Sequence, residues 1–268
     1  MSIRPRIRVA LAASLVALIA GCQSTPKPST AATEAQLPPP KAAEVSPKDR
    51  AALHRELAAG YYERGQMDIA LDELGDAVKL DPDSAAIYNV YGLVYTVLGE
   101  NAKAEQNFQR ALQLEPGNSD IRHNWGWYLC THDRARESIA QFDQAVRNPL
   151  YKTPEIALVN AGRCSSSFGD VAAAEQYFRR ALTVSPGNPN AGYGLAYIAY
   201  RNARFTDARG WLRPAVLQAA PTPEALYLGV CIERKLGDGQ AEMSFTAQLK
   251  NRYPDSAETK AIPTGVCE

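Results

Sequence analysis

Small, aliphatic and aromatic residues recur at fixed offsets along most of the chain. A small residue sits in the middle of each apolar stretch, as at Ala58, Gly92 and Gly162. A large apolar residue between two alanines follows, and a proline ends each unit; the sets are Ala70-Leu74-Ala77-Pro82, Ala104-Phe108-Ala111-Pro116 and Ala174-Phe178-Ala181-Pro186. Spacings of three and four residues place these side chains on one face of a helix. Since a glycine suited to a C-terminal cap lies between the two stretches, each unit is predicted to be a helix hairpin.

The period of about 34 residues and these offsets resemble the tetratricopeptide (TPR) repeat. Six units are predicted, at residues 51–84, 85–118, 119–152, 155–188, 189–221 and 222–255. Ser138 replaces an alanine in the third unit, and the fifth lacks both the glycine and the proline. No stretch alternates with period two, so no sheet is expected. The predicted fold is all-α, a right-handed superhelical solenoid of about six TPR hairpins.

The first helices of stacked TPR hairpins line an inner groove, which is the predicted partner-binding site. The side chains expected there are Arg55, Tyr62, Asn89, Leu93, Thr96, His123, Trp127 and Arg163, followed by Tyr193, Tyr197, Tyr200 and Val230. This mainly aromatic and aliphatic set suits an apolar or amphipathic segment. Only Arg55 and Asn89 lie near positions at which chaperone-adaptor TPRs clamp a carboxylate, so such a clamp is not expected. Trp125 is predicted to pack inward against its partner helix.

Residues 1–21 have the pattern of a secretory signal peptide. Three arginines precede the apolar run from Val9 to Ala20, which is too short to span a bilayer. The segment Leu18-Ile19-Ala20-Gly21-Cys22 resembles a bacterial lipobox, which implies cleavage before Cys22 and lipidation of that cysteine. The alternative is an ordinary signal peptide in which the cysteine is incidental. Several acyl chains on one residue anchor a protein firmly. Residues 22–47 are proline-rich and predicted to be a disordered tether, ahead of a solenoid at 48–255 and a tail at 256–268.

Four further cysteines lie in the predicted solenoid and tail, in an oxidising compartment. Neighbouring repeats lie about 10 Å apart, since packed helices are separated by 8–10 Å. Bridges from Cys231 to Cys130 or Cys164 would cross more than one repeat and exceed the reach of a disulfide. The predicted pairs are therefore Cys130–Cys164 in adjacent first helices and Cys231–Cys267, with four free thiols as the alternative.

The chain carries no sequence signature of an enzyme. Known nucleophile, phosphate-binding and zinc motifs are missing from it. We therefore expect no catalytic residues, no cofactor and no metal site, and a hydrolase using Cys130 and His132 is the disfavoured alternative. The 29 basic and 29 acidic residues balance. No cationic excess is available for phosphates, so nucleic acid is not an expected partner.

The lipobox, the proline-rich tether and six TPRs together resemble one family, the type IV pilus biogenesis and stability lipoproteins called pilotins (PilF/PilW) of Gram-negative bacteria. The more specific marks are Asn124-Trp125-Gly126-Trp127-Tyr128-Leu129, Asn148-Pro149-Leu150-Tyr151 and Gln248-Leu249-Lys250-Asn251-Arg252-Tyr253-Pro254. The cysteines Cys231 and Cys267 depart from the family pattern.

The resemblance implies a non-enzymatic, monomeric lipoprotein on the periplasmic face of the outer membrane. It would bind the type IV pilus secretin and promote its localisation and multimerisation in that membrane. Gln23 after the lipidated cysteine agrees with outer-membrane sorting. The alternative hypothesis is a TPR lipoprotein that organises periplasmic cell-wall enzymes.

Overall fold

The computed structural model describes residues 45–265 and 267, and this part of the chain is entirely helical apart from its connections. The predicted signal peptide, Cys22 and the predicted tether up to residue 44 lie outside the described residues. The helices are α1 Pro47–Glu63, α2 Met67–Leu80, α3 Ala85–Val97, α4 Asn101–Leu114, α5 Ser119–Thr131, α6 Ala135–Arg147, α7 Pro154–Ser167, α8 Val171–Val184, α9 Pro189–Arg201, α10 Phe205–Val216, α11 Pro223–Leu236, α12 Gly239–Arg252, α13 Ala257–Ala261 and the 3₁₀-helix Ile262–Thr264.

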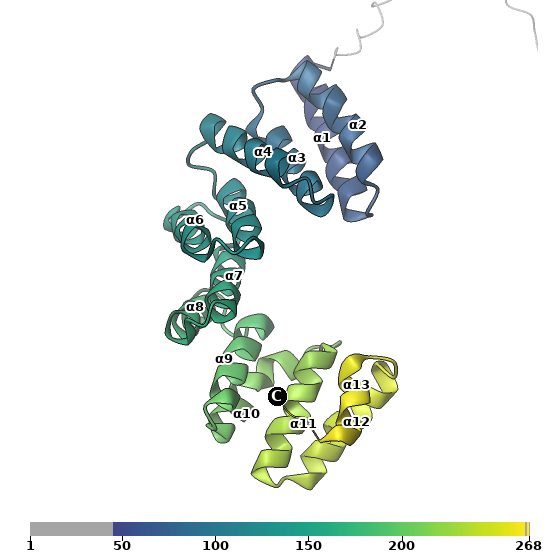
Figure 1. The fold of residues 1–268 in the computed structure, drawn as a ribbon, viewed down its shortest axis with the longest axis vertical. Coiled ribbons are helices and arrows are strands. Elements are labelled where there is room, and N and C mark those ends of the chain that lie inside the picture. Colours follow the sequence, from purple (N-terminus) through teal and green to yellow (C-terminus); the bar gives the residue numbers. More distant parts are fainter. Residues whose placement is uncertain (1–44, 266, 268) are drawn as a thin grey trace, which may run out of the picture. The chain divides into compact units, whose positions relative to one another are not determined.

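Consecutive helices pair as six hairpins, from α1/α2 to α11/α12 (Figure 1). Each odd-numbered helix packs mainly on the even-numbered helix that follows it, and also touches the first helices of the neighbouring hairpins. The odd-numbered helices α1 to α11 therefore form one continuous row. This arrangement confirms the predicted all-α fold of TPR hairpins.

A close contact between a glycine and a phenylalanine ring holds most hairpins together. A Cβ added to Gly92 would lie 2.7 Å from the ring of Phe108, and one added to Gly162 would lie 2.7 Å from that of Phe178. Gly126 with Phe142 and Gly229 with Phe245 repeat the contact, each at 3.0 Å. The repeat glycine is therefore required because it lets the ring of the second helix reach the backbone of the first.

The two remaining hairpins have leucine in place of the phenylalanine and alanine in place of the glycine. Ala58 pairs with Leu74 in one core cluster, and Ala196 lies with Leu212 in another. All four residues are buried. A branched aliphatic side chain opposite alanine thus fills the space that a phenylalanine fills opposite glycine.

The turn between the two helices of every hairpin contains one residue with positive φ. Glycine holds this place four times, at Gly65, Gly99, Gly169 and Gly237. In the two irregular repeats the same place is taken by Asp133, with φ 59°, and Ala203, with φ 56°. Aspartate tolerates the left-handed region, whereas alanine disfavours it, so at Ala203 the solenoid keeps the turn even though the sequence lacks a residue that suits it.

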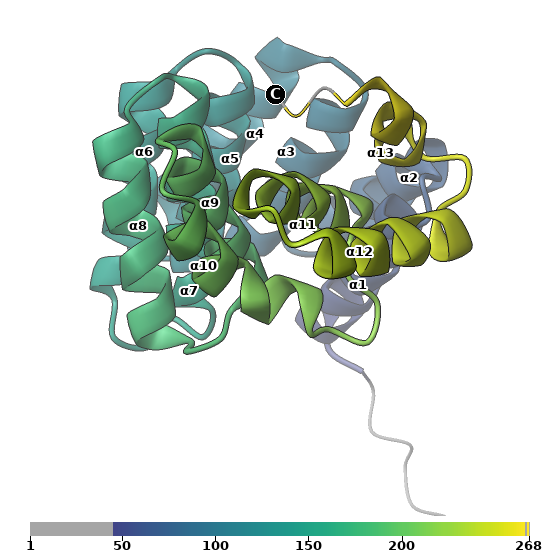
Figure 2. The same cartoon turned by 90° about the horizontal axis from the view of Figure 1, so that it is seen from below.

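The last hairpin is followed by α13, which packs on α11 and α12 (Figure 2). Ile262, just beyond α13, contacts the cluster of Leu226, Val230 and Leu249. The short helix therefore covers the end of the stack, where a further repeat would otherwise pack. No helix of the described part of the chain is both long and apolar enough to cross a membrane.

Replacement of Gly92 by alanine should lower the free energy of unfolding by about 1–3 kcal/mol, because the new methyl group overlaps the Phe108 ring. Chemical denaturation followed by circular dichroism measures the change. In a Phe108→Leu background the same Gly92→Ala step should cost much less, because leucine accommodates alanine in the hairpins at Ala58 and Ala196. An equal cost in both backgrounds would show that the ring is not the cause.

Candidate functional site

A disulfide joins the first helices of the third and fourth hairpins. Cys130 of α5 is bonded to Cys164 of α7, and their Cα atoms are 5.9 Å apart. Cys164 is buried, whereas Cys130 is partly accessible. The bond therefore fixes α5 and α7 side by side at their C-terminal halves.

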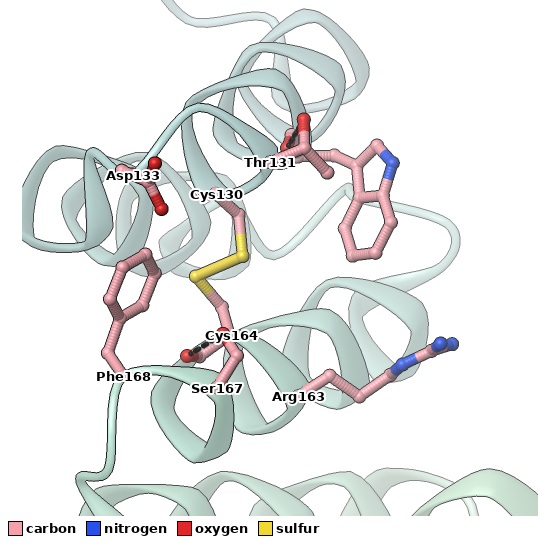
Figure 3. Close-up of a pocket in the computed structure, with 8 residues that line it drawn as sticks. Cys130, Thr131, Asp133, Arg163, Cys164, Ser167 and Phe168 are labelled. Carbon is pink, nitrogen blue, oxygen red and sulfur yellow. Dashed lines mark hydrogen bonds between the residues drawn. A yellow bond between two sulfur atoms is a disulfide. The ribbon is translucent and has the colours of Figure 1, made fainter.

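A hollow of about 370 Å³ opens directly beside this disulfide. Its walls are formed by Trp127, Cys130, Thr131, Asp133, Arg163, Cys164, Ser167 and Phe168. Figure 3 shows the disulfide crossing between the two helices, with Arg163 on one side of it and Phe168 on the other. Apolar rings, one cation and one anion thus surround a single concave place on the row of first helices.

Aromatic side chains continue along the row from this hollow. Trp127 is 37% exposed, and the Arg163 guanidinium lies over its ring at 5.8 Å. On α9 the rings of Tyr193 and Tyr197 stack at 6.5 Å, and Tyr197 is 38% exposed. Arg163 forms no ion pair among the described residues, so its donors are available to a partner.

Several other predicted groove residues bond within the row itself. Asn124 of α5 donates to Asn89 of α3 at 3.1 Å, and Asn160 of α7 lies 3.3 Å from His123 Nε2. Each pair joins neighbouring first helices. These polar side chains therefore serve mainly to hold the row in register.

His123 is the most constrained of these groups. Its ring meets Phe142 edge to face, and its Nδ1 is buried without a hydrogen-bond partner. Burial lowers the pKa of the imidazole, and the nearby Asp120 opposes this shift only in part. A neutral, enclosed imidazole is therefore part of the packing between α5 and α6.

The predicted residues nearer the N-terminus are half-buried. The Thr96 hydroxyl donates to the Gly92 carbonyl of its own helix, and Leu93 packs on the cluster around Phe108 and Trp125. Arg55 pairs with its neighbour Glu56, while burial raises the pKa of Tyr62. Of the eight predicted groove residues, Trp127 and Arg163 are the two classed as exposed.

The far end of the row is closed. Tyr200 is 7% exposed and Val230 is fully buried, although both were expected on the open groove. The second disulfide, Cys231–Cys267, ties the C-terminal segment to α11, with Cα atoms 5.6 Å apart. The accessible part of the row therefore ends near Tyr197.

The disfavoured catalytic pair of Cys130 and His132 is fully engaged in structural contacts. Cys130 is in a disulfide, and His132 stacks on Tyr128 with ring centroids 4.0 Å apart. Its Nε2 also bonds Asn101 at 2.9 Å. Within the described residues, no three histidine, cysteine or acidic side chains are grouped to hold a metal ion.

Sequence reasoning missed several residues of this region. Phe168, 40% exposed, and Asp133 line the hollow because they occupy the ends of two first helices. An apolar residue just before the capping Gly169 was the available signal for Phe168. Trp125 is buried as predicted; its ring meets Phe108 of the preceding hairpin, and the guanidinium of Arg134, the N-cap residue of its partner helix α6, lies over it at 5.5 Å.

Comparison with known proteins agrees with this architecture. Models described as tetratricopeptide repeat match residues 55–119 and 123–189, and another matches residues 167–228. The type IV pilus assembly protein PilF of Pseudomonas aeruginosa is 25% identical over 203 residues, which are 76% of this chain and 81% of PilF.

Two solved structures share the fold over most of their length. The crystal structure of PilW, a widely conserved type IV pilus biogenesis factor, is 32% identical with a TM-score of 0.70. That match covers 80% of this chain and 98% of PilW. The structure of P. aeruginosa PilF has 23% identity and a TM-score of 0.73, and covers 82% of this chain and 99% of its own.

The hairpins and their inner row define a TPR protein built for binding other proteins. The sequence identity to PilW and the coverage of both chains narrow this class to one family. The chain belongs to the PilF/PilW family of type IV pilus biogenesis factors.

Replacement of His123 by glutamine should reduce the acid sensitivity of the fold. Because burial lowers the folded-state pKa below 6.5, the unfolded chain binds the proton more readily. The stabilising effect of the neutral ring is complete above pH 6.5 and is lost as the pH falls below it. Melting temperatures from about pH 8 to pH 5 should therefore decline more steeply for the wild type than for His123→Gln. Parallel curves would contradict this assignment.

Proposed function

We propose that this protein is a non-enzymatic lipoprotein of the outer membrane that binds the type IV pilus secretin. In this proposal it promotes the localisation and multimerisation of the secretin, and hence pilus biogenesis. Membership of the PilF/PilW family is the observation that carries the proposal, because PilW is a type IV pilus biogenesis factor and PilF a pilus assembly protein.

The inner row of first helices supports a binding role. Trp127, Tyr197 and Phe168 keep more than a third of their surface exposed. Rigid aromatic side chains are frequent binding hot spots, since they bury a large apolar area at little entropic cost. Arg163 beside them adds directional hydrogen-bond donors.

The N-terminal segment supplies the membrane attachment in this proposal. Lipid on Cys22 would hold the protein at the periplasmic face, and residues 22–45 would act as a tether ahead of α1, which begins at Pro47. The folded part would then reach a partner in or near the membrane while remaining attached to it.

Cys22→Ser should release the protein from the membrane, because the acyl chains have no attachment point in this variant. Fractionation of cells expressing either form measures the distribution, and Cys22→Ser should be recovered largely in the periplasmic fraction. A neighbouring Ser24→Ala variant is the matched control and should stay membrane-bound. Retention of Cys22→Ser in the membrane fraction would show that another segment provides the anchor.

Trp127→Ala should weaken secretin binding by about 2 kcal/mol, or about thirtyfold in Kd, while leaving the fold intact. The measurement is co-purification and titration with the secretin, together with secretin multimers in a deletion strain that carries each variant. Val184→Ala, a 49% exposed site on α8 outside the row, is the control.

Deletion of the gene tests the function as a whole. The proposal requires loss of secretin multimers and of surface pili, with recovery by the wild-type gene. Normal multimers together with altered cell-wall structure would favour the scaffold of cell-wall enzymes instead.

Unchanged secretin affinity of the Trp127→Ala variant would show that the contact lies on another surface.

A further inference from the structure

Cys267, beyond α13 and the 3₁₀-helix, lies against the row of first helices. Cys267 is bonded to Cys231 of α11, and its carbonyl accepts a hydrogen bond from the Tyr200 hydroxyl of α9 at 3.2 Å. The Arg234 guanidinium lies 3.8 Å from the Cys267 sulfur. Cys267 is therefore held between α9 and α11 by three side chains of the row.

These three side chains have counterparts at the hollow between α5 and α7. Cys231 and Arg234 lie two and five residues after Gly229, as Cys164 and Ser167 lie after Gly162. Because the hairpins share one geometry around this glycine, side chains at equivalent positions of different repeats point in equivalent directions.

The third side chain follows the same rule on the preceding first helix. Tyr200 lies four residues after the small residue Ala196, as Cys130 lies four after Gly126. Cys267 thus lies two repeats beyond the Cys130–Cys164 bridge, and its sulfur is bonded to Cys231 as the Cys130 sulfur is bonded to Cys164 beside the hollow.

The two places differ in how their cysteines are used. On α9, Tyr200 occupies the position equivalent to Cys130. Cys231 of α11 is therefore bonded to Cys267 near the C-terminus instead. At α5 and α7 the two helices supply both cysteines of one bridge, and the hollow of about 370 Å³ beside it stays open. That volume is in the range of pockets that bind small ligands and short peptide segments.

We propose that the hollow between α5 and α7 is the docking place for an extended segment of the partner protein, seated as the chain's own C-terminal segment is seated between α9 and α11. This inference rests on the proposed function and specifies its site. The C-terminal segment acts as a ligand in cis that closes the far end of the row. A partner is thereby confined to the first helices up to α7 and the exposed edge of α9.

The lining of the hollow defines the segment that fits it. Trp127 and Phe168 offer apolar faces, so a small or apolar side chain is expected between them. Arg163 offers guanidinium donors to a main-chain carbonyl or carboxylate oxygen of the segment. In a similar way, the Tyr200 hydroxyl donates to the main-chain carbonyl of Cys267. Asp133 on the opposite wall disfavours a second acidic group there.

A labelled peptide with the sequence of residues 262–268, carrying serine in place of Cys267, tests the proposal without the secretin. Fluorescence anisotropy with the full-length protein should show saturable binding at one site. Trp127→Ala and Arg163→Gln should each weaken it at least tenfold, whereas Val184→Ala should leave it unchanged. A peptide of the same composition in scrambled order should bind at least tenfold more weakly.

Absence of saturable binding, or binding that is insensitive to Trp127→Ala and Arg163→Gln, would overturn the proposal. Circular dichroism of each variant establishes that it is folded. A second readout uses the secretin: benzoylphenylalanine at position 168 should crosslink to it, and the same residue at the equivalent position 235 should not. Secretin that crosslinks only from position 235 would overturn the docking site in the hollow but not the proposed function. Peptide binding in the hollow without any secretin association would overturn only the proposed function.

Discussion

The contact of a glycine on one helix with a phenylalanine ring on the next fixes the geometry on which the rest of the molecule depends. It brings the two helices of a hairpin to a set separation and leaves no room for even one methyl group at Gly92 or Gly162. Phe178 is held from a second side, since a Cβ on Gly194 of the next hairpin would lie 2.5 Å from its ring. Four of the six hairpins have this glycine–phenylalanine contact, and at Phe178 the same ring also fixes the stacking on the next hairpin. These contacts therefore help to decide which side chains of α3, α5, α7 and α11 face the inner row.

The inner row combines side chains that stabilise it with side chains that remain available. Asn89, Asn124, His123 and Asn160 join one first helix to the next, and the aromatic and cationic groups beside them stay accessible. Each repeat in a solenoid touches only its neighbours, so these bonds add to the helix packing that keeps the row continuous from α3 to α7. A continuous row can then present Trp127, Arg163 and Tyr197 from three successive hairpins to a single segment.

Residue spacing was sufficient to predict the hairpins, because the repeat glycines, alanines and rings act locally through one helix pair. It was less informative about the row. Periodicity predicts which way a helical side chain points, but not whether a neighbour covers it, and Val230 and Tyr200 are covered by segments distant in sequence. Positive φ at Ala203 was likewise unpredictable from local propensity, because the stacked hairpins impose a turn that alanine disfavours, while aspartate at Asp133 tolerates it.

Each of the two disulfides includes one cysteine at the same position of its repeat, Cys164 in one and Cys231 in the other. This equivalence bears on how the protein would bind a partner. A bridge that closes a loop of about 35 residues stabilises the fold by about 3–4 kcal/mol in the chain-entropy model. Between α5 and α7 it also holds the walls of the hollow at a fixed separation before any partner arrives. Preorganisation reduces the entropic cost of ordering the site on binding. Since each repeat of a solenoid contacts only its neighbours, local opening is resisted least between repeats, and in the proposed docking of a partner segment the bridge would keep the hollow preformed.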